Sequence, residues 1–281
     1  MQEIQYKESV VSVPEMTELR KSLENSLLFE RIPTEEISYG RYSVRYARTP
    51  AEVRSALDLQ YEVFNLELKN DFIAPIFDEA DEALLPINCV YLIVEEKESS
   101  RVVGTYRICT LEMARETENF FSAHEFLLEE LPGQILSQSI EVSRLCILRE
   151  HRNKQVLFLL WKFLARQLTG TGKRYLFGCC SIFSQDYREA LLAFDKLKSE
   201  NHLHQSLTVS PSPECLFTEE EKAAAVFNGE LILPKLFGSY LKIGAKVCSE
   251  PAIDREFKTV DFFMIFDVQA MNEKYYRMFF T

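Results

Sequence analysis

The spacing of apolar residues along this chain of 281 residues predicts most of its secondary structure. Residues 42–46 alternate between apolar and polar side chains, which is typical of a half-buried strand. Thr49 and Pro50 then precede a broad apolar stripe at helical spacing, so we predict a helix capped by Thr49. Residues 89–95 and 102–110 predict two strands joined by a polar hairpin turn.

Strands and helices continue to alternate through the rest of the chain. The further elements that we expect are a helix over 120–131, strands over 138–147 and 174–180, helices over 154–168, 185–197 and 236–243, and a closing strand over 260–268. This order predicts an α/β (α+β) fold in which helices flank a mixed central sheet. We divide the chain into a helical extension (1–40), a main domain (41–270) with an insertion or lid near 199–230, and a C-terminal tail (271–281).

Composition and charge narrow the class of protein. Hydrophobic residues make up 47% of the chain, and the formal net charge of −11 argues against nucleic acid as a partner. The chain contains no uncharged apolar run of about 18 residues, so no membrane span is predicted. The N-terminus lacks the pattern of a signal peptide. The seven cysteines lie mostly within apolar patterns, which indicates buried thiols in a reducing cytoplasm.

The strand expected over residues 138–147 carries unusual chemistry. Glu141, Ser143 and Arg144 place an acid, a hydroxyl and a guanidinium within four positions of an otherwise apolar segment. Ionisable groups in such a strand are costly unless they are paired or used. The basic segment Arg152–Gln155 then opens a long apolar helix, where free amides and the helix dipole favour an anion. The combination points to an enzyme whose substrate carries phosphate.

The pattern Glu-x-Ser-Arg on this strand resembles the signature of the N-acyltransferases that load amino acids from acyl carrier protein. These enzymes are an offshoot of the GNAT acetyltransferases and are related to the acyl-homoserine lactone synthases. The resemblance covers most of the chain and is closest to the ornithine N-acyltransferase group, which makes the lyso form of ornithine lipid. The other matching segments are Phe77–Asp81, Val103–Arg107, Tyr175–Ser181, Pro234–Ala245 and Phe257–Asp261.

The resemblance implies a GNAT-like, mostly antiparallel sheet in which a bulged strand and its downstream neighbour splay apart. The strand with Glu141 and the strand over 174–181 are the implied pair, with a phosphopantetheine arm in the gap between them. In a regular strand Glu141 and Arg144 point to opposite faces, and a bulge removes this difficulty. Glu141 is then the candidate general base, with Ser143 and Arg144 beside it in the catalytic group. The alternative is a structural ion pair of Glu141 with Arg107 or Arg144.

The acceptor site is also implied by the resemblance. Its candidate residues are Asp78, Asp81, Arg107 and Phe64. An acidic pair suits a cationic amine, although a solvated loop also explains these two aspartates. Gln60 departs from the family, whose members usually carry arginine at this position.

The donor site is expected around the start of the helix over 154–168. Its candidate residues for phosphopantetheine are Leu145, Cys146, Ile147, Arg152 and Lys154. The segment Arg152–Gln155 lacks the glycines with which ordinary acetyltransferases bind the CoA pyrophosphate, which favours acyl carrier protein over CoA. A basic helix start on the surface is the alternative. An acidic carrier protein needs a local basic patch, and the candidate cations are Arg149, Arg152, Lys154, Lys162, Arg166, Lys173 and Arg174.

We therefore expect a cytoplasmic N-acyltransferase that moves a long acyl or 3-hydroxyacyl chain to the α-amine of an amino acid such as ornithine. The donor is the phosphopantetheine thioester of acyl carrier protein, or acyl-CoA, and no metal or tightly bound cofactor is expected. The alternatives are an enzyme similar to the lactone synthases, with S-adenosylmethionine as acceptor, and a non-catalytic acyl-binding module. Tyr240 either donates a proton to the leaving thiolate or only packs its helix. Residues 275–280 either contact the inner membrane peripherally or pack into the core.

Overall fold

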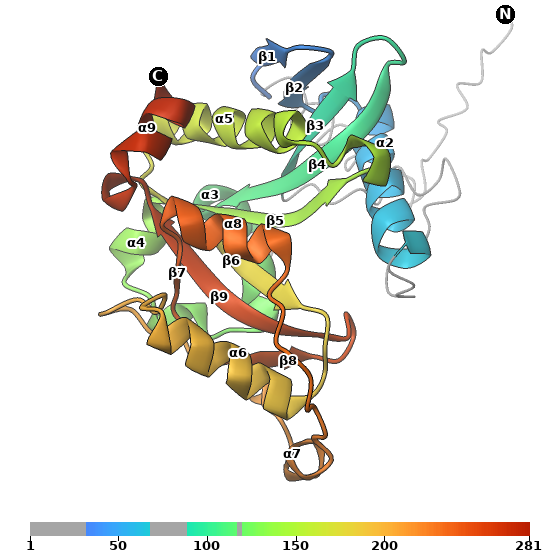
Figure 1. The fold of residues 1–281 in the computed structure, drawn as a ribbon. Coiled ribbons are helices and arrows are strands. Elements are labelled where there is room, and N and C mark those ends of the chain that lie inside the picture. The colour runs from blue at the N-terminus through green and yellow to red at the C-terminus, as the bar shows by residue number, and fades with distance from the viewer. Residues whose placement is uncertain (1–31, 68–88, 117–119) are drawn as a thin grey trace, which may run out of the picture.

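The computed structural model describes residues 32–67, 89–116 and 120–281. In these residues one sheet runs in the order β1-β2-β3-β4-β5-β6-β9-β7, and β8 also pairs with β9 (Figure 1). Neighbouring strands are antiparallel except for β5 and β6, which are parallel. The strands are β1 Glu36–Tyr39, β2 Tyr42–Tyr46, β3 Val90–Glu96, β4 Arg101–Thr110, β5 Ser139–Ile147, β6 Tyr175–Ile182, β7 Lys246–Val247, β8 Ala252–Asp254 and β9 Thr259–Asp267.

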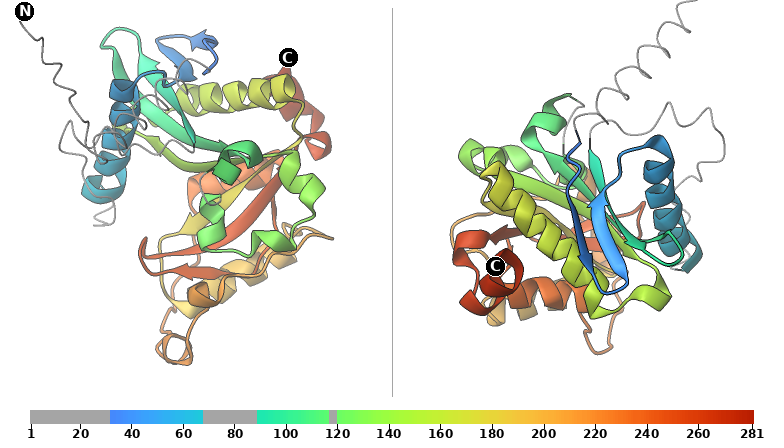
Figure 2. Two further views of the ribbon diagram at one scale, coloured as in Figure 1. Left: turned by 180° about the vertical axis from the view of Figure 1, so that it is seen from behind. Right: turned by 90° about the horizontal axis from the view of Figure 1, so that it is seen from above.

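Helices cover both faces of this sheet, which confirms the expected fold class. Helices α5 and α2 lie on opposite faces of the half formed by β1–β5, and α9 lies against α5 (Figure 2). Leu159, Leu160 and Phe163 of α5 are fully buried, and each contributes roughly 1.5–3 kcal/mol by leaving water. The described helices are α2 Pro50–Tyr61, α3 Leu111–Glu116, α4 Gly133–Ser137, α5 Lys154–Thr171, α6 Tyr187–Ser199, α7 Glu219–Ala223, α8 Lys235–Ile243 and α9 Glu273–Phe280.

Local sequence explains where the main helices begin and end. The Thr49 hydroxyl accepts a hydrogen bond from the Glu52 amide, as expected for the start of α2. Asn153 caps α5 by accepting from two amides of its first turn. Helix α5 ends at Gly172, whose φ of 66° favours glycine. The start of α2 was predicted because a capping hydroxyl depends on one residue type at one position.

The segment 120–131 differs from the expected helix. It forms two short 3-10 turns, Phe121–His124 and Leu128–Glu130. The Glu141 carboxylate binds the amides at the start of the first turn. Between the turns, the Leu127 amide donates to the Ser210 carbonyl at 2.9 Å. Tertiary contacts therefore override the local helical pattern.

The ends of the described chain refine the expected division of the molecule. Residues 1–31 of the expected helical extension lie outside the described residues, but β1, at 36–39, pairs with β2. The expected boundary near residue 40 therefore falls inside a hairpin. The segment from residue 199 contains α7 and packs on the body of the molecule, with Val209 fully buried. In the C-terminal tail Phe279 of α9 is buried against the core.

Candidate functional site

The sheet opens where β5 meets β6. The register pairs Ser139–Glu141 with Tyr175–Phe177, and the rest of β5 has no pairing with β6. The two strands therefore separate near the middle of the sheet, as expected for the splayed pair. Backbone groups of β5 beyond Glu141 face this opening on the side away from β4, so an extended ligand can bind there as a further strand would.

A β-bulge lies on β5 just beyond the residues that pair with β6. Between Ser143 and Cys146, β5 carries one more residue than the opposing stretch of β4. Arg144 inside the bulge has a φ of 55°, a conformation that costs a residue with a side chain of order 1 kcal/mol. Glu141 and Arg144 both contact Phe121, so the bulge brings their side chains to one face.

Gly178 permits the close approach of the strands at the point of separation. A Cβ atom at this position would lie 2.3 Å from the carbonyl oxygen of Val142. That distance is far inside van der Waals contact, and the clashing atom belongs to the backbone. Gly178 therefore determines how tightly the closed end of the opening is packed.

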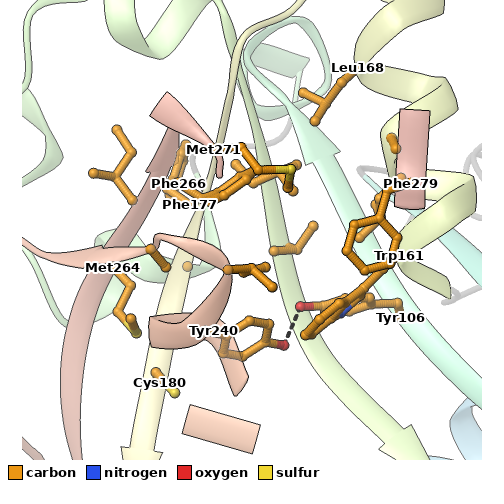
Figure 3. Close-up of a pocket in the computed structure, with 18 of the residues that line it drawn as sticks. Tyr106, Trp161, Leu168, Phe177, Cys180, Tyr240, Met264, Phe266, Met271 and Phe279 are labelled. Atoms are coloured by element: carbon orange, nitrogen blue, oxygen red, sulfur yellow. Dashed lines mark hydrogen bonds between the residues drawn. The ribbon is translucent and has the colours of Figure 1, made fainter. Parts of the chain in front are cut away.

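An apolar cavity adjoins this closed end on the face covered by α5, α8 and α9. Figure 3 shows its lining side chains, which come from β4, β5, β6, β9 and these three helices. The cavity encloses about 700 Å³, part of it open to solvent. Its lining includes Val142, Trp161, Leu168, Leu176, Met264, Phe266, Met271 and Phe279. A lining of this kind suits an aliphatic chain.

A pair of tyrosines places two hydroxyl groups in this apolar cavity. The Tyr106 and Tyr240 hydroxyls share a hydrogen bond of 2.6 Å, and the Tyr240 ring stacks on Trp161 (Figure 3). Burial raises the pKa of both phenols well above the ordinary value. One hydroxyl hydrogen forms the shared bond, so the other is available to a ligand.

Glu141 is fully buried and bound by the first 3-10 turn. Its Oε1 accepts hydrogen bonds from the Ser122 amide at 2.7 Å and the Ser122 hydroxyl at 2.8 Å. Its Oε2 accepts from the Phe121 amide at 3.0 Å. Within the described residues it forms no ion pair with Arg107 or Arg144, although these two guanidinium groups also lie over the Phe121 ring. Glu141 thus fixes the aromatic ring on which both arginines rest.

Two hydrogen-bond donors at the bulge have no hydrogen-bond partner among the residues that the structure describes. The Arg144 guanidinium lies between the rings of Phe121 and Phe257, 4.9 and 4.5 Å from their centroids. It forms no hydrogen bond or ion pair with any described residue, and burial lowers its pKa without removing its charge. The Ser143 hydroxyl is buried, and the described part of the chain offers it no partner. Buried donors of this kind are normally satisfied, so a ligand at the bulge has two groups to bind.

A second, polar cavity contains Arg144 on the face that carries Glu141. It encloses about 820 Å³, part of it open to solvent. Aromatic rings, one cation of the bulge and several carboxylates share its walls. The lining is Phe121, His124, Glu125, Arg144, Glu214, Cys215, Ile253, Asp254, Arg255, Glu256 and Phe257.

Two of the carboxylates that line this cavity, Glu125 and Asp254, lie close to a third, Asp261, which is buried behind the lining. Oxygens of Glu125, Asp254 and Asp261 lie within 4.8 Å of one another. Glu125 is only 5% exposed, and burial followed by the charge of Asp261 raises its pKa to about 9. Burial also raises the pKa of Asp261 to about 6, against hydrogen bonds from Ser181 and Thr259 that lower it.

The start of α5 offers fewer cations than the sequence indicates. Arg152 binds Glu67 through two hydrogen bonds of 2.5 and 2.6 Å, and its Nε donates to the Ile147 carbonyl. Lys154 forms no hydrogen bond or ion pair with a described residue. Three other members of the expected basic patch are also paired. Their bonds are Arg166–Glu35, Lys173–Glu112 and Arg174–Asp267.

Comparison with known proteins places this geometry in a family. A model described as an acetyltransferase (GNAT) domain matches residues 59–162. The L-ornithine N(alpha)-acyltransferase of Rhizobium meliloti (strain 1021) is 29% identical over 248 residues, which is 82% of this chain and 81% of the relative. A protein of the same name from Rhodobacter capsulatus is 29% identical over 260 residues, covering 85% and 95%. The chain is an acyltransferase of GNAT fold.

The chain is also similar to solved structures, at low sequence identity. An aminoglycoside 6'-N-acetyltransferase complexed with coenzyme A is 10% identical, with a TM-score of 0.45 over 80% of this chain and 96% of that chain. The AHL synthase LasI is 11% identical, with a TM-score of 0.43 over 86% and 96%. Within the described residues, this acyltransferase has no helix long and apolar enough to cross a membrane.

The acceptor residues expected from the sequence are only partly brought together. Asp78 and Asp81 lie outside the described residues. Arg107 lies over the Phe121 ring at 5.6 Å, beside the bulge. Phe64 packs against a cluster of buried apolar side chains that includes residues of α2 and α5. Gln60 is buried at 2% exposure, and its Nε2 has no partner in the described part of the acyltransferase.

The expected donor residues occupy distinct positions around the opening. Leu145, Cys146 and Ile147 form the stretch of β5 after the bulge, and Cys146 is buried. Lys154 begins α5 and lines an exposed apolar groove beside it. Arg152 is bound to Glu67, which lowers the pKa of that carboxylate. Lys154 is therefore the cation of this set that is free to meet an anion.

Sequence reasoning missed the polar cavity of this acyltransferase. Phe121 and Glu125 lie in a segment with a helical pattern, and Asp254 follows a stretch with no clear periodicity. The one available signal was Phe257–Asp261, which matches the family without an assigned role. The cavity forms because β8 returns beside the first 3-10 turn, and a sequence pattern does not report such a contact.

Proposed function

We propose that this acyltransferase moves a long acyl group from an acyl thioester to the α-amine of ornithine, which yields an N-acyl amino acid of the lyso-ornithine lipid type. Its relatives named L-ornithine N(alpha)-acyltransferase carry this proposal, because the matches cover more than four fifths of the chain. The geometry supports it with an apolar cavity and a polar cavity on the two faces of the opened sheet.

The donor is proposed to enter between β5 and β6. Its extended arm binds the backbone of β5 from Leu145 to Ile147, and its acyl chain enters the apolar cavity beyond Gly178. Lys154 at the start of α5 meets the phosphate of the arm, where the helix dipole also favours an anion. We favour acyl carrier protein over CoA, since the single phosphate of its arm does not require the glycine-rich loop that binds the pyrophosphate of CoA.

The acceptor is proposed to bind at the bulge from the side of the polar cavity. Its carboxylate meets Arg144, whose guanidinium is held between two rings and lacks a carboxylate among the described residues. The Ser143 hydroxyl supplies a further donor to the reacting groups. A charge-assisted bond of this kind orients the acceptor as well as binding it.

The reaction forms a C–N bond and breaks the C–S bond of the thioester. The amine loses a proton before or during attack, and the departing thiolate takes one up. We assign Glu141 a positioning role in place of that of general base, because its oxygens already accept three hydrogen bonds and it fixes Phe121 under Arg144. Direct proton transfer to Glu141 requires the first 3-10 turn to release it.

The tyrosine pair is proposed to recognise a hydroxylated acyl chain. Tyr106 and Tyr240 retain one hydroxyl hydrogen for a ligand in a cavity that is otherwise largely apolar. A 3-hydroxyl group on the acyl chain is a suitable partner. A Tyr240→Phe variant should lose preference for the 3-hydroxyacyl donor over the plain acyl donor, by roughly 5- to 10-fold in kcat/KM for one hydrogen bond.

An acidic carrier protein is proposed to dock on cations near the start of α5. Arg149, Lys154 and Lys162 have no ion pair among the described residues, so they are the cations that remain for this contact.

Helix α9 is proposed to contact the inner membrane peripherally, as part of a cytoplasmic enzyme. It exposes Tyr276 and Met278, whose exposed fractions are 44% and 40%. Cosedimentation with anionic vesicles tests the membrane contact, and a double variant with serine at both positions should reduce it.

The first test is lipid extraction and mass spectrometry after expression in a bacterium that lacks aminolipids. An acylated ornithine is expected in cells with the parent chain and not in cells with an empty vector. Purified protein should form the same product from ornithine with acyl carrier protein or CoA thioesters, and the ratio of kcat/KM identifies the donor. Folded protein that acylates another amine, such as S-adenosylmethionine, or no amine at all would overturn the proposal.

The carboxylate contact has its own test. Arg144→Gln should raise KM for ornithine by roughly 10- to 100-fold. Ornithinamide, which lacks the carboxylate, should bind the parent weakly and lose little more in the variant. Arg188→Gln removes an exposed cation of α6 as a matched control. Equal losses for ornithine and ornithinamide would show that Arg144 does not bind the carboxylate.

A further inference from the structure

The carboxylate cluster of the polar cavity has an orphaned oxygen at its centre. Glu125 is 95% shielded from solvent, and its Oε2 has no hydrogen-bond partner among the described residues. A buried acceptor without a partner is costly and uncommon. A carboxylate oxygen of Glu125 lies within 4.8 Å of oxygens of both Asp254 and Asp261.

The neighbours of Glu125 do not supply a counter-charge. The ionisable groups that act on it include Asp261, Asp254, the Cys179 thiol and Glu141. No described cation forms an ion pair with the three carboxylates. Arg255, the guanidinium that follows Asp254, instead binds Glu221 and the carbonyls of Glu214 and Leu216. The cluster therefore presents negative potential that no cation of the described chain pairs with.

The other two members of the cluster are held in place by their surroundings. Asp261 accepts hydrogen bonds from Ser181 and Thr259, and both hydroxyls are thereby oriented. One oxygen of Asp254 accepts from the Glu256 and Phe257 amides at 2.8 Å. These bonds hold both carboxylates in place beside Glu125. The cluster is consequently pre-organised for a donor that offers several N–H groups, as an alkylammonium does.

We propose that Glu125, Asp254 and Asp261 bind the side-chain ammonium of a diamino acid acceptor. This inference rests on the proposed function, and it identifies how the same site selects its amine. Arg144 lines the same cavity, so the carboxylate end of the acceptor lies at the bulge while the far end reaches the cluster. The α-amine, next to the carboxylate, then stays beside the opening between β5 and β6. Regioselective acylation of the α-amine follows, because the other amine is bound away from the thioester.

The test compares ornithine with norvaline, which has the same carbon chain without the terminal amine. The full-length parent should show a lower KM for ornithine. Glu125→Gln should raise KM for ornithine by roughly 10- to 100-fold and change KM for norvaline by less than about 3-fold. The ammonium of ornithine lowers the raised pKa of Glu125 and binds the resulting carboxylate, whereas glutamine cannot ionise. Asp254→Asn, at a less buried position, should act in the same direction. Glu129→Gln removes an exposed carboxylate of the same segment and serves as the matched control.

The outcomes separate this inference from the function on which it rests. If Glu125→Gln and Asp254→Asn acylate ornithine with the parent's ratio of KM values, the cluster does not bind the ammonium, while the proposed function stands. If the parent acylates neither amino acid, the proposed function fails and the inference with it. If EDTA abolishes the preference for ornithine and Mg²⁺ or Ca²⁺ restores it, the cluster is a metal site and the inference is wrong.

Discussion

Replacement of Glu125 by glutamine should change how the stability of the protein depends on pH. Burial and the charge of Asp261 raise the pKa of Glu125 from 4.5 to about 9. The folded protein therefore keeps a proton that the unfolded chain releases near pH 4.5, so stability falls as pH rises between these values. Each pH unit in this window lowers the free energy of unfolding by about 1.4 kcal/mol. From pH 5 to pH 8 the loss is about 4 kcal/mol, as an upper value.

The variant Glu125→Gln is neutral in both states and should escape this loss. It should match the parent near pH 5 and be more stable at pH 8 by up to about 4 kcal/mol, or a Tm higher by roughly 10 °C. Urea or thermal unfolding at pH 5, 6, 7 and 8 measures the difference, with Glu129→Gln as the control for loss of an exposed carboxylate. Asp261 is present in all three proteins. Parallel pH profiles for the parent and Glu125→Gln would refute the reasoning, because Glu125 would then be ionised in the folded protein.

Three further changes test the opened sheet. Gly178→Ala should destabilise the fold by about 3 kcal/mol, because its Cβ meets the Val142 carbonyl, whereas Gly133→Ala, with nothing within 4 Å, should be close to neutral in an unfolding assay. Glu141→Gln should lower the free energy of unfolding by roughly 1–3 kcal/mol, since the side-chain amide group would face a backbone N–H donor. Unchanged stability with lost turnover would instead indicate direct proton transfer. Asn153→Ala should cost about 1 kcal/mol through loss of the cap of α5, and a neutral result by urea unfolding would contradict the capping role.

The sequence predicted those parts of the fold that depend on local chemistry. The cap at Thr49 follows from one residue type, and the closing strand β9 follows from a continuous apolar run that is buried except at its last residue. The first 3-10 turn could not be predicted. Its residues have a helical pattern, but the Glu141 carboxylate, 20 residues later than Phe121, binds the amides at the start of that turn.

The candidate site was predictable to a similar degree. Glu141, Ser143 and Arg144 were recognisable because ionisable groups in an apolar strand require an explanation, and the bulge follows from their need to share a face. Charges on the surface were less informative. Arg152 appeared free in the sequence, yet Glu67, 85 positions away, binds it. Glu125 had no signal, since the acids that raise its pKa come from β8 and β9 at the other end of the chain.

The three-residue pairing between β5 and β6 also has a mechanical consequence. It leaves the sheet as two panels, one built from the first half of the chain and one from the second, with a narrow seam between them. An extended ligand that forms hydrogen bonds along β5 would lie between the two panels as an additional strand and hold them together. Donor binding should therefore slow amide hydrogen exchange on both sides of the seam, including in β6 and β9, which lie beyond the strand that the ligand bonds. In the unliganded protein this seam is where we expect the sheet to open first.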